Sequence, residues 1–208
     1  MGRSRKFFVM PQPPSPVDIP SRRLGPGLFA VAGFLLFASV LVATPNARAA
    51  NIYVANYGNS TLTKVDDKGV VSLVASNVEG ACGAAYGFDG NIDVLDLVRG
   101  RVYRISKSGS LSILSGGLVR PEDLAFDSHG TLYTANSDGT IRTVTPEGAT
   151  NILVSGLSSP RGVAFDANGN LFVSNFGNGT ISKINIASAS VNPFATGLHG
   201  PATLAFGP

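Results

Sequence analysis

The residues best suited to chemistry in this 208-residue sequence lie at points about 40 residues apart. They stand in the tripeptides Ala81-Cys82-Gly83, Pro121-Glu122-Asp123 and Pro160-Arg161-Gly162, with Pro201-Ala202-Thr203 at the same spacing. The sequence around them repeats while the central side chains differ. Function is therefore expected at these positions, added to a repeated scaffold. The charged residues Glu122, Asp123 and Arg161 are candidate ligand-binding groups. The structural alternative is an exposed Glu122–Arg161 ion pair, which would contribute about 0 to 1 kcal/mol.

Four Asx residues recur at the same period, each at the end of a short apolar run. They are Asn56, Asp96, Asn136 and Asn175. They are expected on the same face as the tripeptides, as a ring of candidate ligand-binding oxygens. Their recurrence favours a structural role, because Asx side chains at strand ends commonly bond to the backbone of their own turn.

The remaining residues give little support for hydrolytic chemistry. His129 is expected in a turn on the opposite face, and His199 near the channel is a candidate binding residue. Neither histidine has an identifiable nucleophile or orienting partner, and there is no Gly-x-Ser-x-Gly motif. Cys82, the only cysteine, is expected to be a small buried apolar residue. No catalytic residue is assigned.

The elements that position these residues are short strands. The third copy reads as strands at 124–127, 132–135, 141–144 and 151–154, separated by turns rich in Gly, Asn, Asp and Pro. Short β-branched and aromatic runs with such turns indicate antiparallel hairpins. Four antiparallel strands in a repeated unit predict an all-β fold, the β-propeller, with four-stranded blades.

Residues 160–181 resemble the NHL repeat and the related senescence-marker, gluconolactonase and luciferin-regenerating propellers. Residues 121–141 match nearly as well, and the resemblance extends over residues 51–208. It implies a propeller and leaves the activity open. Lactonases of this kind hold a divalent cation through oxygens from several blades. Only Glu122 matches such a ligand position, so calcium is a weak expectation and no cofactor is assigned.

The ends of the repeat region predict how the propeller closes. The repeats open on a second strand at residues 52–55 and end on a first strand at residues 201–206. We expect the C-terminal strand to complete the N-terminal blade, giving about four blades. Two alternatives stay open: an arc truncated from a six-bladed ring, and self-association of two chains through open blade edges.

Residues 1–49 are expected to form an export signal. They hold a basic leader, an uncharged apolar segment at 28–43 and an Ala47-Arg48-Ala49 pattern that predicts cleavage near Ala49. An uncleaved anchor is the alternative, and would be the only contact with a membrane. The chain is thus expected to be periplasmic, secreted or anchored by residues 28–43. Six of the 16 Lys and Arg residues lie in this leader, so the net charge of +3 does not indicate nucleic-acid binding.

From these features we expect an exported propeller at residues 51–208 that acts as a binding, interaction or sensor module. Its ligand, a peptide, protein, glycan or small molecule, is expected on the loop face around the central channel. The alternatives are a metal-dependent hydrolase resembling gluconolactonase and a truncated, non-functional fragment.

Overall fold

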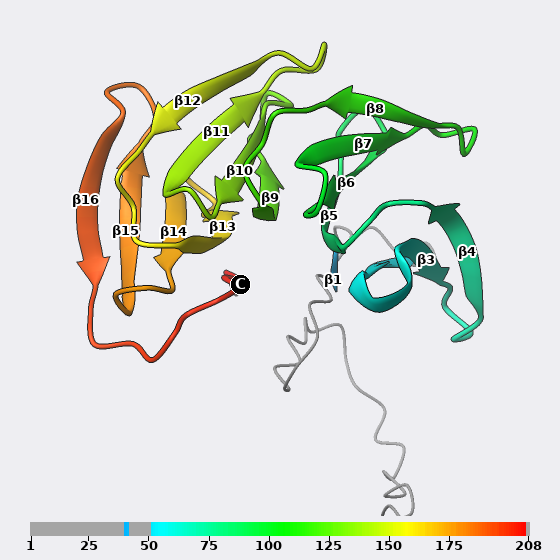
Figure 1. The fold of residues 1–208 in the computed structure, drawn as a ribbon, viewed down its shortest axis with the longest axis horizontal. Helices are drawn as coiled ribbons and strands as arrows, with labels where there is room; N and C mark the ends of the chain where they lie inside the picture. Colours follow the sequence, from blue (N-terminus) through cyan, green and yellow to red (C-terminus); the bar gives the residue numbers. More distant parts are fainter. Residues whose placement is uncertain (1–39, 42–50, 207–208) are drawn as a thin grey trace, which may run out of the picture. The chain divides into compact units, whose positions relative to one another are not determined.

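The fold consists of four antiparallel sheets of four strands each, in a computed structural model that describes residues 40–41 and 51–206 (Figure 1). The one helical element among these residues is a short 3-10 turn, η1 (Tyr57–Asn59). The all-β fold with four-stranded antiparallel blades, predicted from the repeat, is confirmed.

Each sheet is one sequence repeat, and we call the sheets blades 1 to 4 in chain order. Blades 1 and 2 comprise β1 (Val40–Leu41), β2 (Ile52–Asn56), β3 (Thr61–Val65), β4 (Val71–Ser76), β5 (Ala81–Tyr86), β6 (Ile92–Asp96), β7 (Arg101–Ile105) and β8 (Leu111–Ser115). Blades 3 and 4 comprise β9 (Pro121–Phe126), β10 (Leu132–Asn136), β11 (Thr140–Val144), β12 (Thr150–Val154), β13 (Pro160–Phe165), β14 (Leu171–Asn175), β15 (Thr180–Asn185) and β16 (Ser190–Ala195).

The expected closure of the propeller by residues 201–206 is wrong in this structure. Blade 1 obtains its first strand from β1, in which Val40 pairs with Val54 and Leu41 with Tyr53. Residues 201–206 form no strand, and they lie against blade 4 instead. No closed ring is seen among the described residues. The two residues of β1 take the place beside β2 because they supply an extended backbone to an otherwise open sheet edge.

Apart from Val40–Leu41, the predicted leader at 1–49 lies outside the described residues, as do residues 207–208. Within the described part of the chain, no helix has the length and apolar character needed to cross a membrane.

Repeated aspartates shape the hairpin turns at one end of the blades. The Oδ1 atom of Asp127 accepts hydrogen bonds from the backbone N–H groups of His129 and Thr131, both at 2.9 Å. Asp166 does the same for Asn168 and Asn170. These side chains satisfy turn amides that no strand partner reaches. Residues 127–130 and 166–169 are therefore hairpin turns.

Blades stack through apolar side chains, so the core is divided into layers between neighbouring sheets. One cluster joins blades 1 and 2, a second joins blades 2 and 3, and a third joins blades 3 and 4. Tyr133 illustrates the contact, since its ring meets that of Phe165 on the next blade edge-to-face with centroids 5.1 Å apart. A blade has an apolar side chain layer on both faces, which is why one repeat needs neighbours to be stable.

Candidate functional site

The candidate site is built on β-bulges at the start of the first strands. In blade 3, Asn136 pairs with Pro121 and Ala135 with Asp123, which leaves Glu122 as the extra residue. In blade 4, Asn175 pairs with Pro160 and Ser174 with Gly162, which leaves Arg161 extra. A bulge turns a side chain out of the regular alternation of a strand, and bulges are common beside functional sites.

The same irregularity in blade 2 involves Cys82. Ala81 pairs with Asp96 and Ala84 with Val94, so Cys82 and Gly83 lie in the shifted stretch. The three residues that sequence reasoning singled out as chemically distinctive therefore occupy equivalent bulges in three successive blades.

Glu122 carries the most unusual group of the site. Its Oε2 atom is buried and has no hydrogen-bond partner among the described residues. An unpaired buried carboxylate oxygen costs free energy, because water has been removed and nothing replaces it. The carboxylate therefore offers a strong acceptor to a ligand that brings its own N–H or O–H group.

Cys82 lies next to this carboxylate and is not an activated nucleophile. Its thiol is buried and donates to the carbonyl of Pro121 at 3.1 Å. Burial raises the pKa of the Cys82 thiol, and the carboxylates of Glu122 and Asp123 raise it further. A thiol in these surroundings stays protonated at neutral pH, so it packs as a small apolar residue, as expected.

Asp123 acts as a structural tie between blades 3 and 4. Its Oδ1 accepts from its neighbour's amide, Leu124 N–H, at 2.9 Å, and its Oδ2 accepts from Val163 N–H at 3.1 Å. Burial raises the pKa of Asp123 from 3.8 to about 7, although both backbone hydrogen bonds act to lower it. Both of its oxygens are occupied, so Asp123 positions the site more than it offers a free group.

The Arg161 guanidinium lies over an aromatic ring of its own blade. The guanidinium carbon stands 3.6 Å from the centroid of the Phe176 ring, a cation–π contact. The ion pairs found among the described residues do not include Glu122 with Arg161. The Glu122–Arg161 ion pair, given above as the structural alternative, is therefore not formed in this structure.

The predicted Asx residues do lie at the same end of the blades as the bulges. Asp96, Asn136 and Asn175 pair directly with Ala81, Pro121 and Pro160 at the starts of the first strands. The side-chain amides of Asn136 and Asn175 donate within their own blades. Asn136 Nδ2 donates to Thr134 O and Thr140 O, and Asn175 Nδ2 donates to the Thr180 and Ser182 hydroxyls.

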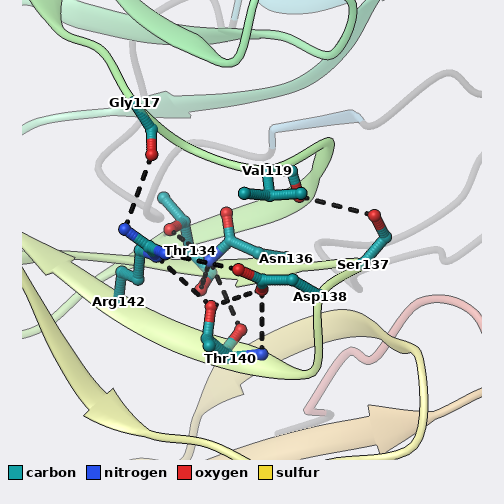
Figure 2. A network of polar contacts seen from close by, with 8 residues as sticks. All are labelled: Gly117, Val119, Thr134, Asn136, Ser137, Asp138, Thr140 and Arg142. Carbon is teal, nitrogen blue, oxygen red and sulfur yellow. Dashed lines mark hydrogen bonds and ion pairs between the residues drawn. The ribbon is translucent and has the colours of Figure 1, made fainter.

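Figure 2 shows the polar network around Asn136, which joins the β10–β11 turn to the connection between blades 2 and 3. Arg142 forms an ion pair with Asp138 at 3.3 Å and reaches the carbonyl of Gly117, while Ser137 N–H donates to Val119 O. The amide oxygens of Asn136 and Asn175 are buried and have no hydrogen-bond partner among the described residues. These side chains chiefly brace the rim of the bulges.

The remaining two Asx residues are more fully engaged. Asn56 Nδ2 donates to Val54 O and to the hydroxyls of Thr61 and Thr63. Asp96 accepts from the backbone N–H groups of Glu79 and Arg99, and forms an ion pair with the Arg99 guanidinium at 3.2 Å. Asn56, Asp96 and Asn136 bond to nearby backbone groups, as predicted, whereas Asn175 bonds to the Thr180 and Ser182 hydroxyls.

Few side chains near the candidate site could bind a metal ion. Among residues 40–41 and 51–206, no group of three or more His, Cys, Asp and Glu side chains is placed to hold an ion. His199 is exposed in the connection that follows β16, and His129 is exposed in the β9–β10 turn. Neither histidine lies in one of the three bulges.

The known proteins that this chain resembles share its fold. The family model described as "Strictosidine synthase-like, N-terminal" matches residues 108–144, and a search of the curated proteins gives no match. Among solved structures, virginiamycin B lyase from Staphylococcus aureus is similar with a TM-score of 0.66 and 16% identity, over 77% of this chain and 60% of that one.

Two further structures show the range of proteins with this fold. A gluconolactonase from Xanthomonas campestris has a TM-score of 0.62 and 15% identity, over 68% of this chain and 56% of that one. A chain of the nidogen/laminin complex has a TM-score of 0.63 and 17% identity, over 69% and 59%. The chain thus spans about 60% or less of the length of these proteins. Its four blades and these likenesses show that it has the β-propeller fold, in agreement with the resemblance to NHL-like and gluconolactonase-type propellers.

Proposed function

We propose that this chain is an exported, non-catalytic binding module whose ligand docks at the bulged ends of the first strands. The observation that carries the proposal is the buried Oε2 atom of Glu122, which has no hydrogen-bond partner among the described residues. Native proteins leave few such groups, and each one needs an explanation. A ligand that donates to this oxygen supplies one.

The chemistry of the ligand follows from the neighbouring side chains. Glu122 can accept an N–H or O–H group, and the Arg161 guanidinium over Phe176 places a cation one blade away. Peptides, glycans and polar small molecules all carry suitable donors. The absence of an activated nucleophile at Cys82 favours binding without covalent chemistry.

The fold alone does not determine which activity this chain has. Proteins with similar structures include a lyase, a gluconolactonase and a member of a nidogen/laminin complex. Function in such a fold resides in the loops and bulges, and these differ between blades in this chain. The proposed binding function therefore rests on the site residues and not on the fold.

Metal-dependent hydrolysis is the second candidate, and one observation favours it. The amide oxygens of Asn136 and Asn175 are buried without partners, as is Glu122 Oε2, and hard cations prefer such oxygen ligands. The set does not fit a calcium site, because a single carboxylate is present where six or more oxygen ligands are required.

The proposal is tested by native mass spectrometry of the full chain with a defined panel of peptides and oligosaccharides. Glu122→Gln retains the shape of the side chain and removes its charge, and Glu147→Gln makes the same change on an exposed turn. Binding that is lost in Glu122→Gln and retained in Glu147→Gln supports the site. Equal binding by both variants, or no binding to any member of a broad panel, contradicts it.

Export is tested separately by N-terminal sequencing of the chain recovered from a bacterial expression host. A protein that starts at or near Ala50 supports cleavage after the Ala47-Arg48-Ala49 pattern. Recovery of the intact leader in the cytoplasm contradicts export and leaves the binding proposal unaffected.

A further inference from the structure

The outer face of blade 4 has the side chains of an inter-blade face without the next blade. Phe194 precedes Ala195 in β16, at the position that Val74, Leu114 and Leu153 hold in the first three blades. Those three side chains pack into the layers between blades, whereas Phe194 is 62% exposed. This face is thus formed for stacking on a further sheet.

Residues 201–206 already begin such a sheet. The Ser174 hydroxyl donates to Ala202 O at 2.8 Å, and the rings of Phe172 and Phe206 meet edge-to-face at 5.1 Å. The second contact matches the 5.1 Å contact of Tyr133 with Phe165, which joins blade 3 to the first strand of blade 4. Residues 201–206 therefore occupy the place of a first strand beside blade 4.

This first strand has no second strand paired with it among the described residues, and 43% of Phe206 is exposed. Blade 1 has the opposite arrangement. Its β2, β3 and β4 form regular five- or six-residue strands, but its first strand, β1, pairs through only two residues. One end of the repeat array thus carries a first strand that has no second strand. At the other end, the first strand of blade 1 is paired through only two residues.

The repeats also give the register in which these two ends fit. Pro201–Phe206 corresponds to Pro160–Phe165, and β2 corresponds to β14. Since Val163 pairs with Val173 in blade 4, Leu204 would pair with Val54. In this structure Val54 is paired with Val40 of β1.

We propose that residues 201–206 of one copy supply the first strand of blade 1 of a second copy, in the place that Val40–Leu41 hold while the leader is attached. Two copies related by a two-fold axis exchange this strand reciprocally, so both open ends are covered. The four blades of each copy then form one ring of eight, within the range found in propellers. A six-residue strand offers more backbone hydrogen bonds to β2 than a two-residue strand, which favours the exchange.

Closure within one chain is not seen among the described residues. In the single chain, residues 201–206 are held on blade 4 by Ser174, and the edge of β2 is held by β1. The blade 4 face and the blade 1 face are different surfaces, so they join head to tail. Such a contact closes into a ring when the rotation permits and extends into fibres when it does not.

The test begins with the full-length chain without substitutions, by size-exclusion chromatography with light scattering. The expected mass is twice that of the 21.4 kDa chain, over a concentration series. A monomer at all concentrations overturns the proposal. A series of larger assemblies overturns the closed two-copy ring.

Cross-linking then tests the register. Full-length Val54→Cys is mixed with full-length Leu204→Cys under oxidising conditions, and a disulfide-linked pair of chains is expected. Val54→Cys mixed with Val163→Cys is the matched control, because Val163 already pairs with Val173 in its own blade. Cys82 is buried and present in all three variants, so its background is equal.

Circular dichroism verifies that each variant retains its sheet content before mixing. A linked pair in the first mixture and none in the control supports the strand exchange. Equal linkage in both mixtures, or none in either while the variants are folded, overturns it. Val40→Pro removes a backbone donor from β1, so its dimer is expected to persist to concentrations at least as low as those of wild type, and a dimer that dissociates at higher concentration than wild type contradicts the displacement of β1.

Discussion

The carboxylate of Asp123 on β9 accepts the backbone N–H of Val163 on β13 at 3.1 Å, so it ties two blades together beside the candidate site. Its other oxygen accepts from Leu124 N–H. This carboxylate is therefore a structural support for the bulge that carries Glu122. Its protonation should be visible in the stability of the protein.

Asp123 is expected to give the protein a pH-dependent stability. Its folded-state pKa, about 7, lies above the ordinary value of 3.8, so the folded protein binds this proton more tightly than the unfolded chain. The stabilisation is complete below about pH 4 and is lost as the pH rises through about 7. Urea unfolding from pH 4 to pH 8 measures it. The difference in free energy between wild type and Asp123→Asn should change across this window, and a constant difference contradicts the raised pKa.

Arg104→Leu is expected to destabilise the protein strongly. Arg104 binds both oxygens of Asp93 at 2.8 and 2.7 Å, and Asp93 is only 1% exposed. Burial raises the pKa of Asp93 even beside this arginine, so the charge is costly without its partner. The expected loss is about 3 to 5 kcal/mol.

Arg142→Leu is the matched control for this prediction, because its pair with Asp138 is longer, 3.3 Å, and more exposed. Its removal is expected to cost about 0 to 1 kcal/mol. Urea denaturation of both variants makes the comparison, and similar losses would contradict the assigned difference in burial.

Gly162→Ala is expected to disturb the contact between blade 4 and residues 201–206. An added Cβ would meet Ala202 O, and would stand 2.8 Å from Ser174 Oγ and 2.9 Å from Thr203 Cα. Crowding of this kind typically costs about 1 to 3 kcal/mol. Gly58→Ala is the control, because a Cβ added there would have no atom within 4 Å. Thermal unfolding should separate the two variants, with Gly162→Ala the less stable.

Cys82 is expected to resist thiol reagents in the folded protein. The side chain is buried, and its raised pKa keeps the thiolate population low. Labelling with a chromogenic disulfide reagent at pH 8 should be slow in buffer and complete in concentrated urea. Rapid stoichiometric labelling of the folded chain would indicate an accessible thiolate and restore a nucleophilic role.

Much of the fold was predictable because the same local pattern is repeated. In the third copy, strands predicted at 132–135 and 141–144 are Leu132–Asn136 and Thr140–Val144 in the structure. Alternating apolar residues and Asp-Gly turns determine these hairpins locally. The positions of Glu122 and Arg161 could also be recognised, because a non-repeating residue stood inside a repeating frame.

Features that depend on distant partners could not be predicted. Nothing in Val40–Leu41 marks a strand, since its pairing arises from the open edge of β2. The hydrogen bonding of Asp123 depends on an N–H group supplied 40 residues later by the next blade. Residues 201–206 carry the pattern of a first strand, yet the sequence does not say which sheet they join, and the expected pairing with β2 of the same chain was wrong.

The most direct test of the central claim, that the bulged site binds a ligand through Glu122 without a metal ion, is a calcium titration followed by thermal unfolding. Full-length wild type and Glu122→Gln are melted with and without calcium chloride. A cation at 100 times its dissociation constant would add about 2.7 kcal/mol of stability. The account predicts melting temperatures that calcium leaves unchanged in both proteins. A calcium-dependent rise in wild type that Glu122→Gln abolishes would contradict it and identify a metal site.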